Sequence, residues 1–302
     1  MKGLTSAVFT PLHEDASLDL ERIPGIVDHL EQDGVSALYV LGSTGEGLSL
    51  TTKERRAVAE AYVQAASGRL PVVIHVGHNC LHEAQELAAH AQYIGANAIS
   101  AIPPCYFKPE TTEGLVACLA KITAGAPELP FYYYHIPVKT GMEIDLAAFL
   151  GLCAERLPTM VGVKFSDSRL NEYLACQNLI RNAPFDFVFG VDEMLLSAWV
   201  AGMRGAVGTT FNFAAPLYLR IIACFERGKL EQAQRHQAQA AAMVDTILDT
   251  CGRPGFKALM SVIGQDCGPH RLPHGTASSE GVVKMARALD AIGFFEWGDP
   301  MV

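Results

Sequence analysis

The chain reads Met160-Val161-Gly162-Val163-Lys164 at its sixth apolar run, which ends in a single amine. A short run of this kind is typical of a buried parallel strand, because helices cover such strands on both faces. An amine at the end of a buried strand loses hydration, so its pKa falls and it can attack a carbonyl to form a Schiff base. Taken alone, the run is equally compatible with a lysine that ends the strand and extends its ammonium group to water.

The rest of the chain repeats the pattern of a short apolar run followed by an amphipathic stretch. We expect strands at residues 5–9, 37–40, 72–76, 98–101, 131–134, 161–164, 187–189 and 205–207, with helices at 20–32, 52–66, 82–94, 115–124, 145–155, 171–180, 193–201 and from about 216 to 226. This alternation predicts an α/β fold, the (β/α)8 or TIM barrel. The alternative, an open doubly wound sheet, usually begins with a G-x-G-x-x-G turn, and none follows the first two strands.

The remaining residues look helical throughout, with helices expected at 230–248, 255–263 and 278–292. We therefore predict a barrel catalytic domain over residues 1–228 and a C-terminal helical extension over residues 229–302. The extension is expected to pack on the barrel, so that both form a single structural unit.

Composition and charge exclude several classes of partner. Half of the 302 residues are hydrophobic, the formal net charge is −9, and no basic cluster is present, which argues against nucleic acid or an anionic membrane as partner. No apolar run is long enough to span a bilayer, and the first residues lack the apolar core of a secretory signal. The eight cysteines form no C-x-x-C pair. We expect a cytoplasmic protein whose cysteines are reduced and buried.

Polar side chains gather where the predicted strands end, which is where barrels of this kind place their chemistry. They are Ser43 and Thr44 after the second strand, Tyr134 on the fifth, Lys164 and Ser166 on the sixth, Asp192 and Glu193 after the seventh, and Thr209 after the eighth, together with Gly190, which has no side chain, before Asp192. We expect an amine, a phenol, hydroxyl groups and two carboxylates to share one mouth.

For two of these segments, the sequence indicates how the residues are arranged. The loop from Gly42 to Gly47 places two hydroxyls among glycines, whose backbone amides can approach an anion closely; a carboxylate fits better than a nucleotide phosphate, because the P-loop lysine is missing. Tyr132, Tyr133 and Tyr134 alternate faces if they form a strand. Tyr134 would then face the interior near Lys164 and exchange a proton with a substrate oxygen, whereas Tyr133 would only pack.

Metal binding is the main rival interpretation for the histidines. His75, His78 and His82 are spaced H-x-x-H-x-x-x-H, but the first ends a strand and the last opens a helix, so they share no face. Asp192 and Glu193 are neighbours in sequence and suit a polar ligand better than a metal ion. We therefore predict no metal site.

Taken in order, these motifs resemble the dihydrodipicolinate synthase/N-acetylneuraminate lyase superfamily of pyruvate-dependent aldolases. The resemblance covers essentially the whole chain and rests on Gly42-Ser43-Thr44-Gly45-Glu46, Tyr134 with Ile136-Pro137, and Gly162-Val163-Lys164. Ser43, the run at 131–137 and the Asp192–Glu193 pair are similar to the N-acetylneuraminate lyase branch. Lys139 departs from the pattern: the synthases have an arginine there that binds a carboxylate, and the lyases usually have an apolar residue.

The resemblance implies a metal-free class I aldolase that cleaves N-acetylneuraminate (sialic acid) reversibly to N-acetylmannosamine and pyruvate. It implies that Lys164 forms a covalent imine in place of any cofactor and that Tyr134 moves the proton. Ser43 and Thr44 would bind the substrate carboxylate, and the sugar tail would be bound by Ser166, Gly190, Asp192, Glu193 and Thr209. It also implies a homotetramer in which Tyr106 approaches a neighbouring subunit's site.

Three alternatives remain open at this point. The chain could be a dihydrodipicolinate synthase or a 2-keto-3-deoxy sugar acid aldolase, which Lys139 favours. It could be a non-catalytic sugar-acid binding protein, although the presence of both Lys164 and Tyr134 argues against lost catalysis. A nicotinamide oxidoreductase is the third, and it lacks the glycine fingerprint.

Overall fold

The computed structural model describes residues 1–177 and 185–297. Its strands form one closed barrel in chain order, in which every neighbouring pair is parallel and β1 pairs with both β2 and β8. The predicted (β/α)8 barrel is confirmed. The strands are β1 (Gly3–Ala7), β2 (Ala37–Val40), β3 (Val72–His75), β4 (Ala98–Ala101), β5 (Phe131–His135), β6 (Met160–Phe165), β7 (Asp186–Phe189) and β8 (Gly205–Gly208).

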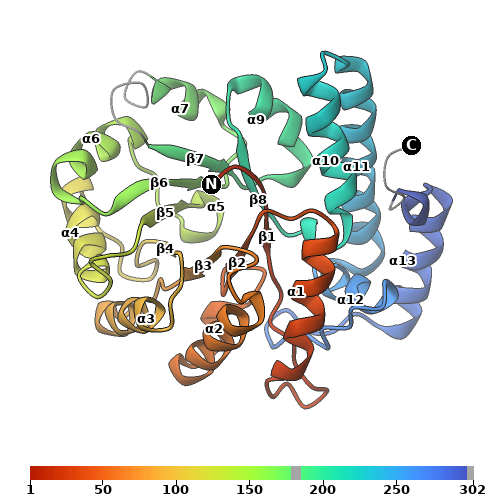
Figure 1. Ribbon diagram of the computed structural model, residues 1–302, viewed down its shortest axis with the longest axis horizontal. Coiled ribbons are helices and arrows are strands. Elements are labelled where there is room, and N and C mark those ends of the chain that lie inside the picture. Colours follow the sequence, from red (N-terminus) through yellow and green to blue (C-terminus); the bar gives the residue numbers. More distant parts are fainter. Residues whose placement is uncertain (178–184, 298–302) are drawn as a thin grey trace.

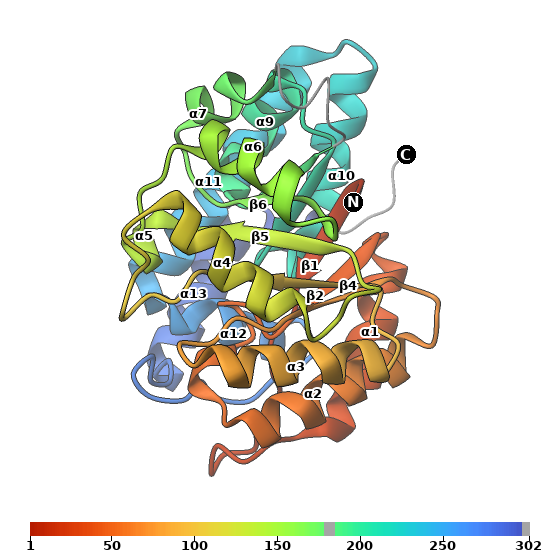
Figure 2. The ribbon, with the colours of Figure 1, turned by 90° about the vertical axis from the view of Figure 1, so that its left-hand side faces the viewer.

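Helices surround the barrel, and Figure 2 shows α3 and α4 running along its outer side. The described α-helices are α1 (Ile23–Gln32), α2 (Thr52–Ala66), α3 (Leu81–Tyr93), α4 (Thr112–Thr123), α5 (Pro137–Thr140), α6 (Leu146–Arg156), α7 (Leu170–Ala175), α9 (Leu195–Ala201), α10 (Phe211–Glu226), α11 (Leu230–Cys251), α12 (Pro254–Val262) and α13 (Ser279–Ala291). Short 3-10 turns are η1 (Leu20–Arg22), η2 (Gly47–Ser49), η3 (Asp192–Met194) and η4 (Phe294–Glu296). The predicted helix at 171–180 begins as α7, which ends at Ala175, and residues 178–180 lie outside the described ranges.

Helix α10 begins at Phe211, five residues before the predicted start at Pro216, and a kink lies between these two positions. Ala214 has non-helical dihedral angles (φ −141°) inside the helix. Pro216 has no amide to bond the carbonyl of Asn212 four residues earlier, and that carbonyl instead accepts a hydrogen bond from His29 Nε2 at 3.0 Å. The proline therefore marks a bend rather than the first turn.

The core has two layers that follow the alternation of side chains along each strand. Tyr132 and Tyr134 lie in the cluster inside the barrel, whereas Tyr133 lies outside it and packs on Phe149 with ring centroids 4.7 Å apart. The predicted orientation of the three tyrosines is confirmed. The same period of two places His135, next after Tyr134, on the outer face.

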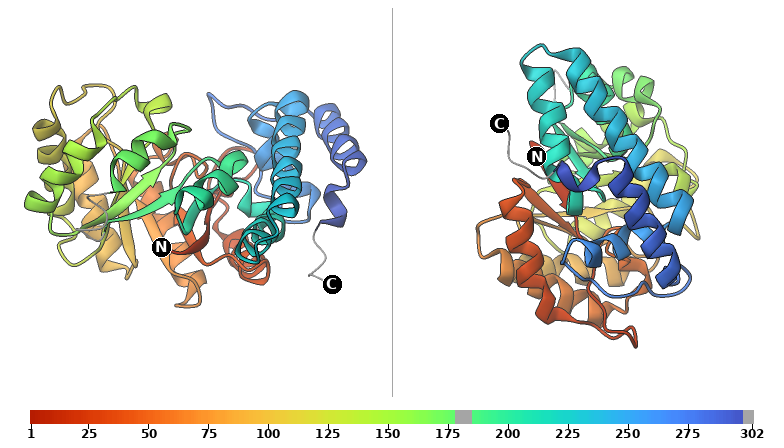
Figure 3. Two further views of the ribbon diagram at one scale, coloured as in Figure 1. Left: turned by 90° about the horizontal axis from the view of Figure 1, so that it is seen from above. Right: turned by 90° about the vertical axis from the view of Figure 1, so that its right-hand side faces the viewer.

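The C-terminal helices gather on one side of the barrel, where α11 packs against α10 and α13 (Figure 1). Seen from above, they form a layer at the opposite end of the molecule from α3 and α4 (Figure 3). Among the residues that the structure describes, no helix combines the length and apolar character needed to cross a membrane. All eight cysteines are free, but the prediction that they are buried is confirmed only for Cys153, Cys176 and Cys267. Cys80 is exposed just before α3 begins, and the other four are partly exposed.

Candidate active site

Lys164 lies near the end of β6 with only 3% of its surface exposed. In the barrel register it sits opposite Tyr134 of β5, and its Nζ lies 3.9 Å from the ring centroid of Tyr39 and 4.0 Å from that of Tyr134. Burial lowers the pKa of Lys164, against the opposing influence of Tyr134 and Asp192. A larger share of the amine is therefore neutral at neutral pH, as a nucleophile requires.

Tyr134 lies directly beside this amine, on the neighbouring strand β5. Its hydroxyl lies 3.5 Å from Ser43 Oγ, and its ring meets the rings of Tyr39 and His75 edge-on, at 5.9 Å in each case. Burial raises the pKa of Tyr134, but the charge of Lys164 and the hydrogen bond with Ser43 lower it. Their combined effect is larger, so the pKa of Tyr134 falls below its usual value. The phenol is thus easier to ionise than a free tyrosine.

The loop after β2 brings Ser43 and Thr44 to the same place. Its backbone turns on itself, because the amides of Glu46 and Gly47 donate to the carbonyls of Ser43 and Gly42, both at 3.2 Å. A Cβ at Gly47 would overlap the carbonyl oxygen of Leu41, so the turn needs a glycine there. Thr44 reaches across the mouth, and its hydroxyl oxygen lies 2.6 Å from that of Thr209 after β8.

A buried ion pair that the sequence did not predict holds this loop from behind. Glu46, at φ +55°, accepts a hydrogen bond from Lys257 of α12 at 3.0 Å, and both side chains are almost fully buried. His270 Nδ1 lies 2.8 Å from the same oxygen, and the Arg271 amide donates to the other at 2.8 Å. Burial alone would raise the pKa of Glu46, but these partners lower it to about 2. The C-terminal extension therefore anchors the Ser43–Thr44 loop.

The opposite wall is formed by residues that follow β6, β7 and β8. Asp192 accepts two hydrogen bonds from Thr210, from the amide at 2.9 Å and from the hydroxyl at 2.7 Å. Burial raises the pKa of Asp192 to about 6, although these hydrogen bonds oppose the rise. Glu193 is exposed at the rim. A Cβ at Gly190 would overlap Ser166 Oγ, so the glycine leaves room for that hydroxyl.

One cavity of about 390 Å³ brings these groups together at the carboxyl ends of the strands. All nine residues predicted for the site line it: Ser43, Thr44, Tyr134, Lys164, Ser166, Gly190, Asp192, Glu193 and Thr209. The structure thus places them around one space, while their individual roles stay predictions. The size is within the usual range for a small-molecule site.

The cavity has a further wall, of which the sequence had pointed only to Lys139. It is formed by Val244, Arg253, Phe256, His270 and His274 of the C-terminal extension, together with Lys139 of α5. Burial and the nearby Arg253 lower the pKa of Lys139. Neither cation has an ion-pair partner within the described ranges. The cationic Arg-x-x-x-Lys spacing at the start of α12 was the available signal, but nothing in the sequence shows that α12 faces the mouth.

Two other expectations concern residues outside this cavity. Tyr106 is 76% exposed and packs edge-on against the exposed Phe107, with centroids 4.9 Å apart; it does not line the cavity of its own chain. His75, His78 and His82 do not form a group with metal-ligand spacing in the described part of the chain. His75 is instead buried beside Tyr134, and burial lowers its pKa well below the usual value.

Comparison with known proteins gives a consistent result. A family model described as "Dihydrodipicolinate synthetase family" matches residues 1–292. Proteins named N-acetylneuraminate lyase from Pongo abelii and Homo sapiens are 40% and 39% identical to the chain, each over 99% of this chain and 95% of the relative. A solved structure of Proteus mirabilis N-acetylneuraminate lyase is similar with a TM-score of 0.93 at 34% identity, covering 97% of this chain and 99% of that one.

Proposed function

This chain belongs to the dihydrodipicolinate synthetase family, and we propose that it is a class I aldolase that cleaves N-acetylneuraminate reversibly to N-acetylmannosamine and pyruvate. One observation carries the proposal: a buried amine with a lowered pKa lies opposite a phenol on the neighbouring strand, in a cavity with a hydroxyl-rich loop. The relatives named N-acetylneuraminate lyase support the choice of substrate.

The chemistry begins with attack by neutral Lys164 Nζ on the keto carbon of the open-chain substrate. Loss of water gives a protonated imine, which is an electron sink. Tyr134 removes the proton from the C4 hydroxyl, the C3–C4 bond breaks, and its electron pair moves into the imine to leave an enamine. The aldehyde departs as N-acetylmannosamine, the enamine takes up a proton at C3, and water hydrolyses the imine to release pyruvate and the free amine.

The rest of the cavity orients the substrate. The hydroxyls of Ser43 and Thr44, with the Thr44 amide, bind the C1 carboxylate at the loop that Glu46 anchors. Asp192 and Glu193 accept hydrogen bonds from the sugar hydroxyls, and Ser166, Gly190 and Thr209 complete that side. A carboxylate acceptor suits a polyhydroxyl tail, because each hydroxyl needs a partner once it leaves water.

No cofactor is needed in this scheme, since the covalent imine on Lys164 supplies the electron sink. We further propose that the barrel of residues 1–228 and its extension act as one catalytic unit in the cytoplasm. We also propose a homotetramer; the exposed Tyr106 and Phe107 support a contact with another subunit, because aromatic residues are enriched at interfaces.

Reductive trapping tests the imine. The protein is incubated with pyruvate and borohydride, and the modified peptide is located by mass spectrometry. Lys164 should carry the adduct, and Lys164→Gln should abolish it. Lys139→Gln is the matched control, because Lys139 lines the same cavity and also has a lowered pKa. An adduct at Lys139 with Lys164 unmodified would exclude the proposed nucleophile.

A second assay decides the substrate. Pyruvate release is compared for N-acetylneuraminate and a 2-keto-3-deoxy sugar acid, and condensation is measured with pyruvate and aspartate semialdehyde. Lys139 and Arg253, which line the cavity and have no ion-pair partner among the described residues, favour a second acidic group and so keep the synthase and sugar-acid aldolase in the comparison. Fastest turnover of N-acetylneuraminate supports the proposal, and no product in a single turnover would indicate a binding protein.

A further inference from the structure

His135 is a buried histidine whose ring nitrogens have no hydrogen-bond partner. It lies at the end of β5 on the outer face of the barrel, is 1% exposed, and stacks on Phe165 with centroids 5.4 Å apart and an interplanar angle of 14°. Neither Nδ1 nor Nε2 is hydrogen-bonded within the described residues. A buried imidazole normally pairs at least one nitrogen, so an unmade interaction remains at this position.

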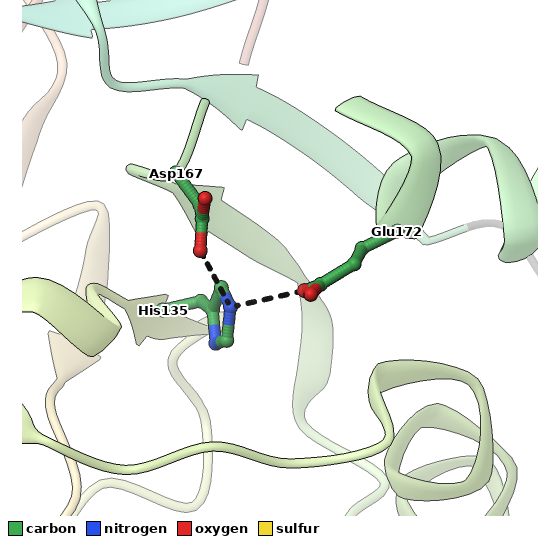
Figure 4. Close-up of side chains that lie close together, drawn as sticks. All are labelled: His135, Asp167 and Glu172. Carbon is green, nitrogen blue, oxygen red and sulfur yellow. Dashed lines mark ion pairs between the residues drawn. The ribbon is translucent and has the colours of Figure 1, made fainter. Parts of the chain in front are cut away.

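The free Nε2 points between two carboxylates, Asp167 from the loop after β6 and Glu172 from α7 (Figure 4). It lies 4.0 Å from Asp167 Oδ2 and 3.7 Å from Glu172 Oε2, and one ligand atom from each of the three residues lies within 4.8 Å of the others. Both separations are too long for hydrogen bonds. Two ligands of one tetrahedral zinc ion, each about 2.0–2.2 Å from it, lie about 3.3–3.6 Å apart, so the three side chains would close by a few tenths of an ångström or more around a shared ion.

The charge around His135 is also unbalanced. Arg169 binds Asp167 at 2.6 Å, Glu172 at 2.8 Å and Glu143 at 2.9 Å, so three carboxylates surround one guanidinium. Arg169 approaches Glu172 through Oε1 and leaves Oε2 facing the histidine.

An imidazole binds a metal ion through a neutral ring nitrogen, and both ring nitrogens of His135 are without a hydrogen-bond partner within the described residues. Three carboxylates and one guanidinium leave two negative charges, which one divalent cation balances.

We propose that His135, Asp167 and Glu172 bind a divalent cation, with Zn²⁺ as the best match to one imidazole and two carboxylates. The site lies outside the barrel wall and takes no part in the imine chemistry. It would join the ends of β5 and β6, the strands that carry Tyr134 and Lys164 on the opposite face. The inference does not depend on the proposed substrate.

Calorimetric titration of the chelator-treated full chain with ZnCl2 at pH 7 tests the site. One ion should bind per chain, and His135→Gln and Glu172→Gln should each weaken binding at least about 10-fold, because even the loss of a group that only supports a ligand costs about that much. His90→Gln is the control, because His90 forms a surface pair with Glu60 at 2.8 Å and should leave zinc affinity unchanged.

Folding of each variant is checked by circular dichroism, and Glu172→Gln keeps the test valid if the buried His135 variant fails to fold. Substitution with Co²⁺ should also give visible absorption bands in the parent that Glu172→Gln loses. Failure of the parent to bind zinc, or equal affinity in the parent and Glu172→Gln, would overturn the proposal. Loss of zinc binding with intact pyruvate trapping at Lys164 would separate this site from the catalytic one.

Discussion

Replacing Lys257 with methionine should destabilise the fold and loosen the loop that holds Ser43 and Thr44. The change removes the amine that lies 3.0 Å from Glu46 and leaves a buried carboxylate with two remaining partners, His270 and the Arg271 amide. Removing one member of a buried ion pair typically costs 3–5 kcal/mol, and the two surviving contacts place this case at the lower end, about 3 kcal/mol.

The loss can be converted to a melting temperature. An unfolding entropy of about 2.1 cal/mol/K per residue over the 302 residues of the chain is about 0.6 kcal/mol/K. A loss of about 3 kcal/mol therefore lowers the melting temperature by about 5 °C. Exposed Lys53 on α2 is the matched control, and Lys53→Met should shift the melting temperature by less than about 1 °C.

Two further measurements separate this account from a general packing defect. The double variant Glu46→Gln with Lys257→Met removes the uncompensated charge and should recover part of the lost stability. In Lys257→Met alone, the KM for N-acetylneuraminate should rise by a larger factor than kcat falls. Glu46 has its pKa lowered to about 2, so its contribution is fully present above its ordinary value of 4.5 and is lost as the pH falls toward 2. A melting temperature and KM equal to those of Lys53→Met would refute the reasoning.

Three other predictions follow from the cavity. Tyr134→Phe should lower kcat for carbon–carbon cleavage by about 10²- to 10⁴-fold, the range for a lost acid–base group, while borohydride still traps pyruvate on Lys164. KM for the sugar acid should rise as the pH falls below about 6, where the carboxyl of Asp192 gains a proton; Asp192→Asn should remove that dependence in a pH series. Gly190→Ala should raise KM at least several-fold because the added methyl overlaps Ser166 Oγ, and equal KM values would contradict this steric account.

Much of the site could be predicted because a barrel orders its strand ends in chain order. Strands five and six are neighbours in such a barrel, and the alternation of side chains places Tyr134 on the inner face. Lys164 occupies the matching position on the next strand. The residues after β2, β7 and β8 were found by the same rule. These inferences needed only the period of a strand and the position of its end.

The parts that could not be predicted depend on contacts between distant segments. Glu46 and Lys257 are separated by 211 residues, and no local pattern pairs them. The cavity wall that includes Arg253 and His274 depends on the direction in which α11 leads the chain back over the mouth. The grouping of His135 with Glu172 likewise depends on where a short helix docks outside β6.

The pairing of Tyr134 with Lys164 has a consequence for how this scaffold can change over time. Their spacing is set by the fixed distance between adjacent strands, about 4.8 Å, and not by any flexible connection. Insertions or drift in the surrounding loops and in α12 can therefore reshape what enters the mouth without disturbing the reactive pair. New specificities are accessible by remodelling the rim alone, with the bond-breaking apparatus inherited intact.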